Sequence, residues 1–173
     1  MKTISKIRKV VEVITRIFGY LAALALLANV VIIMANIILR AGGSSVVGAE
    51  EYVSLFQVAV IFLALGYTQH NHGLVHVAFF MKKLPAKLPM ILWTIHAWVG
   101  TVIVYILCSQ TLKRIPAVKQ VTQSLLLPLK PWYIVLLVGC IVYFIAQLFD
   151  AVMSTVGLFN KEVGDEVKAN WPA

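Results

Sequence analysis

The sequence is poor in charge. Only 13% of its residues are Asp, Glu, Lys or Arg, whereas soluble domains carry about 25%. Hydrophobic residues make up 61% of the chain and the mean hydropathy is +0.90. A water-soluble fold could not bury so many apolar side chains, so many of them would be exposed to water on its surface. We therefore expect a protein whose surface is covered by lipid.

Patterns that carry common chemistry are also missing. The sequence has no CxxC, HExxH, P-loop or GxGxxG motif. Its two cysteines, Cys108 and Cys140, lie in apolar runs, which makes a disulfide framework unexpected. Because no convergent set of nucleophile, base and metal ligands can be assembled, we predict that the chain is not an enzyme and holds no cofactor. The net charge of +8 comes from basic residues beside apolar runs, where membrane proteins gather them, so nucleic acid is not expected as a partner.

Four apolar runs are long enough to cross a bilayer, since a helix of about 20 residues spans a hydrocarbon core of about 30 Å. The fold class predicted is an all-α integral membrane protein with four transmembrane helices and an amphipathic N-terminal helix. Residues 1–16 form the basic N-terminal segment, residues 17–156 the membrane domain and residues 157–173 a cytoplasmic tail. The predicted spans are about 17–39, 52–68, 88–110 and 132–156.

The sidedness follows from the basic residues. Four crossings place both termini on one side, and that side carries most of the Lys and Arg, so both termini are predicted to be cytoplasmic. The N-terminal segment has apolar residues at helical spacing. It either lies in the plane of the inner interface before the first span or simply extends that span into the cytoplasm.

Polar residues within the spans are the candidate interaction sites. Asn29 and Asn36 are seven residues apart and Arg40 follows four later, so they share one helix face. Asparagine in lipid commonly bonds to a neighbouring helix, so packing is favoured over a solute or ion site. Asp150 lies near the inner end of the last span, where it can reach headgroups or pair with a base.

The second span begins with the adjacent carboxylates Glu50 and Glu51. Gln57 follows Glu50 by seven residues, so the two side chains share one face of the helix. Carboxylates suit the positive end of a helix dipole, and Arg40 lies just across the short loop. An ion pair or capping role is the leading interpretation. A contact with a partner subunit and a proton or cation site are the alternatives.

The third span offers small residues, Ala97, Gly100 and Thr101, for close helix contact. It also contains His96, which is expected to be a hydrogen-bonded packing residue. The segment 113–130 is too polar to span, yet it contains three consecutive leucines, which suits a loop or short helix at the outer interface. Two axial histidines suffice for haem, so a haem- or quinone-binding membrane anchor is the main alternative function, with His96 paired to one of His70, His72 and His76.

Short motifs follow one another along the chain in a distinctive order. They are N-x-x-x-R at 36–40, the Glu pair at 50–51, FLALG at 62–66, GLVHV at 73–77, LP at 84–85 and PLKPW at 128–132. Their order and spacing resemble the small, four-helix membrane subunit of TRAP (tripartite ATP-independent periplasmic) transporters over about residues 10–155. One motif departs from the family pattern: where the family often has H-[IV]-x-[VI]-D, residues 74–78 read LVHVA, so no role of that His and Asp can be carried over.

This resemblance implies a division of labour. A periplasmic binding protein captures an organic acid, and a large membrane subunit moves it by a sodium-driven elevator motion. The small subunit, surrounded by membrane lipids, steadies the immobile scaffold and helps to receive the binding protein. The resemblance further implies the bacterial inner membrane as location, and sialic acid or a C4-dicarboxylate as substrate, with a weak preference for sialic acid. A small self-assembling exporter would require a buried carboxylate within a span, and Asp150 lies too near an end.

Overall fold

The structure is a computed structural model that describes residues 2–71, 88–160 and 163–164. It consists of four long α-helices and one short 3-10 helix, η1 (Ile115–Ala117). The long helices are α1 (Lys2–Ala41), α2 (Ala49–His70), α4 (Leu88–Arg114) and α5 (Lys130–Phe159). Each is long and apolar enough to cross a membrane, which confirms the predicted all-α fold with four membrane helices.

Local sequence explains where the helices begin and end. Past the C-terminus of α1, Gly43 adopts a φ of +83°, the left-handed conformation in which glycine ends many helices. The first turn of α2 carries Glu50 and Glu51, whose negative charge suits the positive end of the helix dipole. Pro131 lies in the first turn of α5, where its missing N–H is no loss.

Helix α1 is continuous from the N-terminal segment into the first predicted span. Its 40 residues correspond to about 60 Å at 1.5 Å per residue, roughly twice the hydrocarbon thickness. A separate helix that turns near residue 16 is therefore not what the structure has. The N-terminal segment is the beginning of the spanning helix, as in the second of the two interpretations given above.

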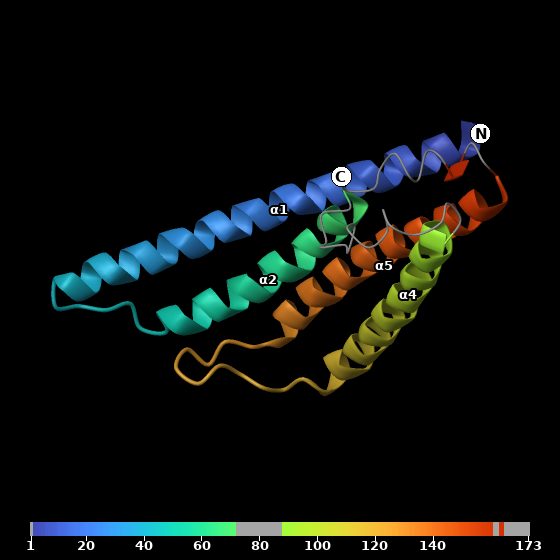
Figure 1. Cartoon of the computed structure of the whole chain (residues 1–173). Coiled ribbons are helices and arrows are strands. Elements are labelled where there is room, and N and C mark those ends of the chain that lie inside the picture. The colour runs from blue at the N-terminus through green and yellow to red at the C-terminus, as the bar shows by residue number, and fades with distance from the viewer. Residues whose placement is uncertain (1, 72–87, 161–162, 165–173) are drawn as a thin grey trace.

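The four helices lie side by side in one row, in the order α1, α2, α5, α4 (Figure 1). The extensive contacts are between α1 and α2, between α2 and α5, and between α4 and α5, whereas α1 touches α5 only slightly. We call the end with the loops 42–48 and 115–129 the loop end, and the opposite end, where the N-terminus lies, the terminal end. The row leaves two broad faces that none of the four described membrane helices covers, unlike a closed four-helix bundle.

Two glycines bring α2 and α5 together at the centre of the row. A Cβ at Gly139 would lie 2.6 Å from the carbonyl oxygen of Phe62, and one at Gly66 would lie 2.8 Å from Cγ1 of Val142. Membrane helices commonly use small residues for such close approach, because lipid gives helices no hydrophobic reason to associate. Backbone-to-backbone packing thus holds the middle of the row.

The terminal end has a small apolar cluster of its own. Met90 and Trp93 of α4 pack with Met153 of α5 and with Val163, which follows α5 in the chain. Val163 is buried, so this part of the predicted tail packs onto the membrane domain. Residues 161–162 and 165–173 of that tail lie outside the described residues.

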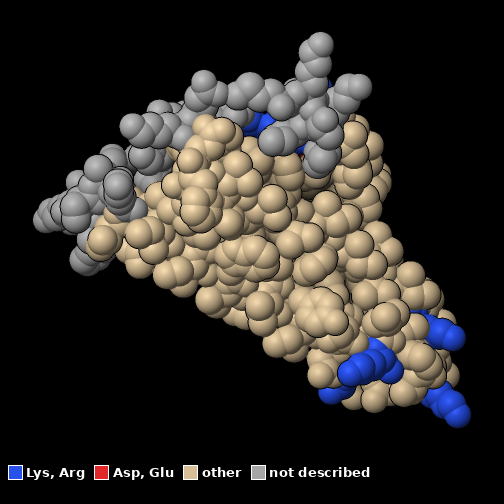
Figure 2. All heavy atoms as spheres, turned by 90° about the vertical axis from the view of Figure 1, so that its right-hand side faces the viewer, with Lys and Arg blue, Asp and Glu red and all other residues tan. Residues whose placement is uncertain are grey.

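The surface between the two ends is almost entirely uncharged. Figure 2 shows a broad face of uncharged residues with Lys and Arg side chains gathered at one tip and beside the grey part of the chain. Large apolar side chains are exposed along all four helices; examples are Leu24, Val31, Ile103 and Ile141. A band of this kind matches the hydrocarbon region of a bilayer, with the charges at its margins.

Candidate functional site

The best-defined polar site lies at the loop end, where a carboxylate holds a loop. Both oxygens of Glu51 accept hydrogen bonds from successive backbone amides. Oε1 accepts from the N–H of Ser124 at 2.6 Å, and Oε2 accepts from the N–H of Leu125 at 3.0 Å. An ionised acceptor makes such bonds short and strong. Glu51 therefore fastens the loop between α4 and α5 onto the first turn of α2.

The loop so fastened is a small hairpin, which we call the outer hairpin (residues 118–129). Val121 and Pro128 form an antiparallel bridge. Thr122 and Leu127 face each other, because the N–H of Thr122 donates to the Leu127 carbonyl and the N–H of Leu127 donates to Oγ1 of Thr122, both at 3.0 Å. The turn between them therefore has a defined shape rather than that of an open loop.

One residue of this turn has an unusual backbone. Leu126 has a φ of +52°. No other residue except glycine has a positive φ in the described part of the chain. This left-handed conformation costs a residue with a Cβ about 1–2 kcal/mol. Leu126 is also 68% exposed, so its side chain gains nothing from packing inside the chain.

The shorter loop at this end, 42–48, is held as well. Oδ1 of Asn36 accepts a hydrogen bond from the N–H of Val46 at 3.1 Å, which ties the loop back to α1. Gly48 has a φ of +71°, and the side chain of Leu125 occupies the space where a Cβ would stand. The outer hairpin therefore rests on Gly48 as well as on Glu51, so the two loops form one surface.

Two hollows accompany this arrangement. A shallow one of about 340 Å³ lies between the first turns of α2 and the outer hairpin, and its lining includes Glu50, Glu51, Thr122 and Gln123. A larger groove of about 540 Å³ runs between α1, α2 and α5 and is lined only by apolar residues, among them Phe18, Phe56 and Val138. The first is open and small, and the second has no polar group with which to orient a hydrophilic solute.

Polar side chains also link the helices in the half of the row towards the terminal end. Nε2 of Gln147 donates to the carbonyl of Ala97 at 3.1 Å, which joins α5 to α4. Nε1 of Trp98 donates to Oγ1 of Thr155 at 3.0 Å across the same pair of helices. These bonds and the buried Ala97 and Thr101 confirm the small-residue contact face expected on the third span.

Asp150 belongs to this internal set. Its Oδ2 accepts a long hydrogen bond from Nε2 of Gln69 at 3.4 Å, which joins α5 to the last turn of α2. Asp150 also lies within electrostatic range of His96 of α4. The carboxylate thus lies where α2, α4 and α5 come together.

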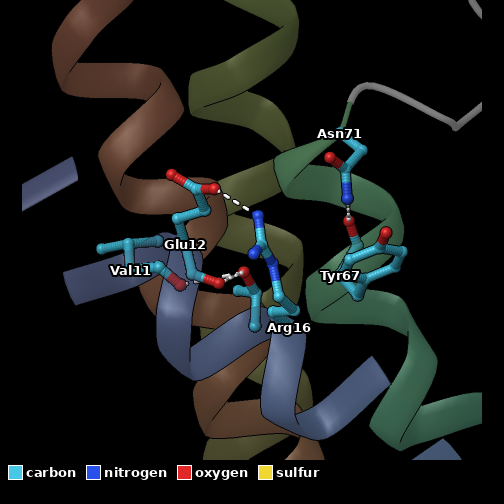
Figure 3. Close-up of polar contacts among 6 residues, drawn as sticks. Val11, Glu12, Arg16, Tyr67 and Asn71 are labelled. Carbon is cyan, nitrogen blue, oxygen red and sulfur yellow. Dashed lines mark hydrogen bonds and ion pairs between the residues drawn. The ribbon is translucent and has the colours of Figure 1, made fainter. Parts of the chain in front are cut away.

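An ion pair at the start of α1 lies close to the end of α2. Nη2 of Arg16 contacts Oε1 of Glu12 at 2.6 Å, one helical turn away. Figure 3 shows Arg16 beside Tyr67 of α2 and beside Asn71, the residue that follows α2. Gly19 lies against the ring of Tyr67 at this contact. Both charged groups are exposed, so the pair itself adds little stability.

The structure sorts the predicted site residues into two groups. Asn36, Glu51 and Asp150 are used within the chain, as described above, and Asn29 is buried between helices with an Oδ1 that has no hydrogen-bond partner among the described residues. The exposed residues are Arg40, Glu50 and Gln57.

The predicted pairing of the glutamates with Arg40 is not seen. In the described part of the chain the ion pair is Arg16–Glu12, and Glu51 bonds to loop amides instead. Backbone amides 73 and 74 residues away in sequence were not foreseen as its partners, because no side-chain pattern marks them. Gln69 and Gln147 were also missed as links between helices, although a polar residue in an apolar run is a signal for such a role.

The histidines fall in different places. His70 is half-buried at the end of α2, and His96 is exposed on α4. His72 and His76 lie outside the described residues. Within the described ranges no group of three or more His, Cys, Asp or Glu residues is placed to hold a metal ion.

Comparison with known families identifies the chain. Residues 29–156 match the model of the family described as "Tripartite ATP-independent periplasmic transporters, DctQ component". The chain belongs to the DctQ family. This membership confirms the resemblance to the small membrane subunit of TRAP transporters, because the matched range runs from α1 to near the end of α5. No curated protein and no solved structure matches the chain significantly.

As a DctQ component, the chain is a multi-pass membrane protein and one part of a tripartite transporter. The family is a component of transporters rather than a class of enzymes. The alternative function as a haem- or quinone-binding anchor is consequently not favoured.

Proposed function

We propose that this DctQ subunit is a non-catalytic scaffold of a sodium-driven importer of an organic acid in the bacterial inner membrane. The observation that carries the proposal is the family match across all four helices. In an elevator mechanism the moving part gains travel only against something fixed in the bilayer. A row of four apolar helices gives more contact with lipid and with a partner than a closed bundle of the same length, because none of the four described helices covers either broad face.

The partner on one of these faces is the large membrane subunit. The proposed contacts are the exposed polar residues Arg40, Glu50 and Gln57. Among the described residues Arg40 and Glu50 make no ion pair within the chain, and Gln57 presents an exposed amide. Asn29, Asn36, Glu51 and Asp150 are proposed to hold the scaffold together instead. The loop end, which then faces the periplasm with both termini in the cytoplasm, supplies a surface for the substrate-binding protein.

A co-purification experiment tests the partnership. The full chain carrying an affinity tag is expressed together with the large membrane subunit of the same transporter, and the two are expected to elute together from detergent. The variant Arg40→Glu with Glu50→Lys reverses the proposed contact charges, and Arg114→Glu serves as the matched control at the same end. Elution of the tagged chain by itself, under conditions in which both proteins are made and folded, would refute the proposal.

The substrate is proposed to be sialic acid or a C4-dicarboxylate, bound by the other subunits. The shallow hollow beside Glu50 and Glu51 is lined by charged side chains, and its acidic groups would repel a carboxylate. Calorimetry with the purified chain should therefore give no saturable heat with sialate or succinate. A saturable isotherm with either acid would overturn the scaffold role while leaving the family membership intact.

A further inference from the structure

The outer hairpin has a turn of defined shape, an exposed leucine at its tip and a left-handed backbone at that leucine. Packing between the helices explains none of these three features. Its turn is held in shape by Glu51 and by the Thr122–Leu127 pair. Its tip exposes Leu126 on a backbone that a leucine rarely adopts. A turn needing φ > 0 is usually supplied by Gly or Asn, so local geometry does not account for a leucine here. A structure that keeps an unfavourable residue at a defined, exposed place points to a function for its side chain.

Basic residues lie on the outer hairpin and beside it in the chain. Lys119 lies within it, Lys113 and Arg114 precede it and Lys130 follows it, and all four are exposed. In the described part of the chain none of these makes an ion pair. The first turn of α2 contributes two carboxylates at this end, Glu50 and Glu51, so the four bases outnumber the acids and the end of the chain stays positive.

The height of the hairpin relative to the lipid follows from the helix ends. Trp132 follows Lys130 in the first turn of α5 and packs edge-on against Phe56 of α2 at a centroid distance of 5.5 Å. Tryptophan at a helix end typically lies at the headgroup level. The hairpin folds back over the N-terminus of α2, where Leu125 touches Gly48. Gly48 precedes Phe56 by eight residues, or about 12 Å of helix, so the tip lies outward of the Trp132 ring, on the headgroup side of it.

We propose that the outer hairpin is a membrane-surface anchor: Leu126 enters the headgroup layer at the loop end, and the basic residues around it bind anionic phospholipid headgroups. An apolar side chain at a preformed tip is inserted without first ordering the loop, because Glu51 has already ordered it. Exposed lysines and arginines near the surface add attraction to anionic lipid that falls with salt. The proposal concerns this chain alone and does not depend on which substrate the transporter carries.

Depth measurements with a nitroxide label test the anchor. The label is placed at Gln123→Cys on the exposed side of the hairpin, in the full chain with Cys108 and Cys140 replaced by alanine. Vesicles consist of phosphatidylcholine alone or mixed with phosphatidylglycerol, and collision with oxygen and with a water-soluble nickel chelate reports the depth. A label at Ser45, in the other loop of the same end, is the control.

The key variant is Leu126→Asn, because asparagine tolerates the left-handed backbone and removes only the apolar side chain. We expect the unsubstituted tip to be shielded from the nickel chelate, more so with phosphatidylglycerol and less at high salt. Leu126→Asn should raise nickel accessibility at position 123 severalfold and leave position 45 unchanged. A second variant, Lys119→Gln with Lys130→Gln, should abolish the effect of phosphatidylglycerol while Leu126 remains inserted.

Three outcomes would overturn the proposal. The first is a tip label that is as accessible to nickel as the control in both lipid mixtures. The second is a tip that becomes shielded only when the periplasmic binding protein is added, which would make a protein and not the lipid surface the occupant. The third is a label at position 123 that stays shielded from the nickel chelate in Leu126→Asn. Because that variant keeps the hairpin, this result would show that the leucine side chain is not the anchor.

Discussion

Replacing Gly139 by alanine should loosen the contact between α2 and α5. The added Cβ would stand 2.6 Å from the Phe62 carbonyl oxygen and 2.7 Å from its carbon, whereas ordinary contacts of this kind begin near 3.4 Å. The helices must part locally by the difference, 3.4 − 2.6 = 0.8 Å, because the obstacle is backbone and no rotamer change removes it. Overpacking of this kind costs about 1–3 kcal/mol, and the higher helix propensity of alanine offsets up to about 1 kcal/mol of that cost.

The net loss of up to about 2 kcal/mol is expected to raise the unfolding constant by up to about 25-fold, at a factor of ten per 1.4 kcal/mol. Circular dichroism during titration of mixed micelles with a denaturing detergent measures this change. Gly42→Ala is the matched control, since the same methyl there meets its nearest atom, the carbonyl oxygen of Leu39, at 3.5 Å. If Gly139→Ala unfolds at the same detergent fraction as the unsubstituted chain, α2 and α5 do not cross at Gly139 and the row described here is wrong.

Two further substitutions probe the loop end and the contact between α4 and α5. Glu51→Ala removes both acceptors of the hairpin amides, so amide hydrogen exchange at residues 124 and 125 should accelerate while exchange in the middle of α5 stays unchanged; equal exchange before and after would show that Glu51 does not hold the hairpin. Gly100→Ala places a methyl group where the amide of Gln147 now lies and should destabilise the chain by about 1–3 kcal/mol. Adding Gln147→Ala should recover part of that loss in a double-mutant cycle, and strict additivity would contradict the contact.

Much of the fold could be predicted because the membrane makes hydropathy decisive. A span must be apolar for about 20 residues and must satisfy its own backbone, so four runs gave four helices. The lateral order of the helices could not be predicted in the same way. It depends on where glycines such as Gly66 and Gly139 let backbones meet, and a glycine in an apolar run does not name its partner.

The polar residues show the same limit. Asn36 and Glu51 stand out in the sequence as polar groups at span ends, and both proved to bind loops. Their partners are backbone amides of distant or featureless segments, which no residue type reveals. The nearest opposite charge in sequence, Arg40, was therefore the wrong partner for Glu51.

The central claim is that this DctQ subunit is required for transport but does not itself carry the substrate. The direct measurement is sodium-driven uptake of a labelled organic acid into proteoliposomes, in the presence of the periplasmic binding protein. Vesicles containing both membrane subunits should take up the acid, and vesicles containing only this chain should not. Uptake by this chain alone, or undiminished uptake by the large subunit without it, would contradict the account.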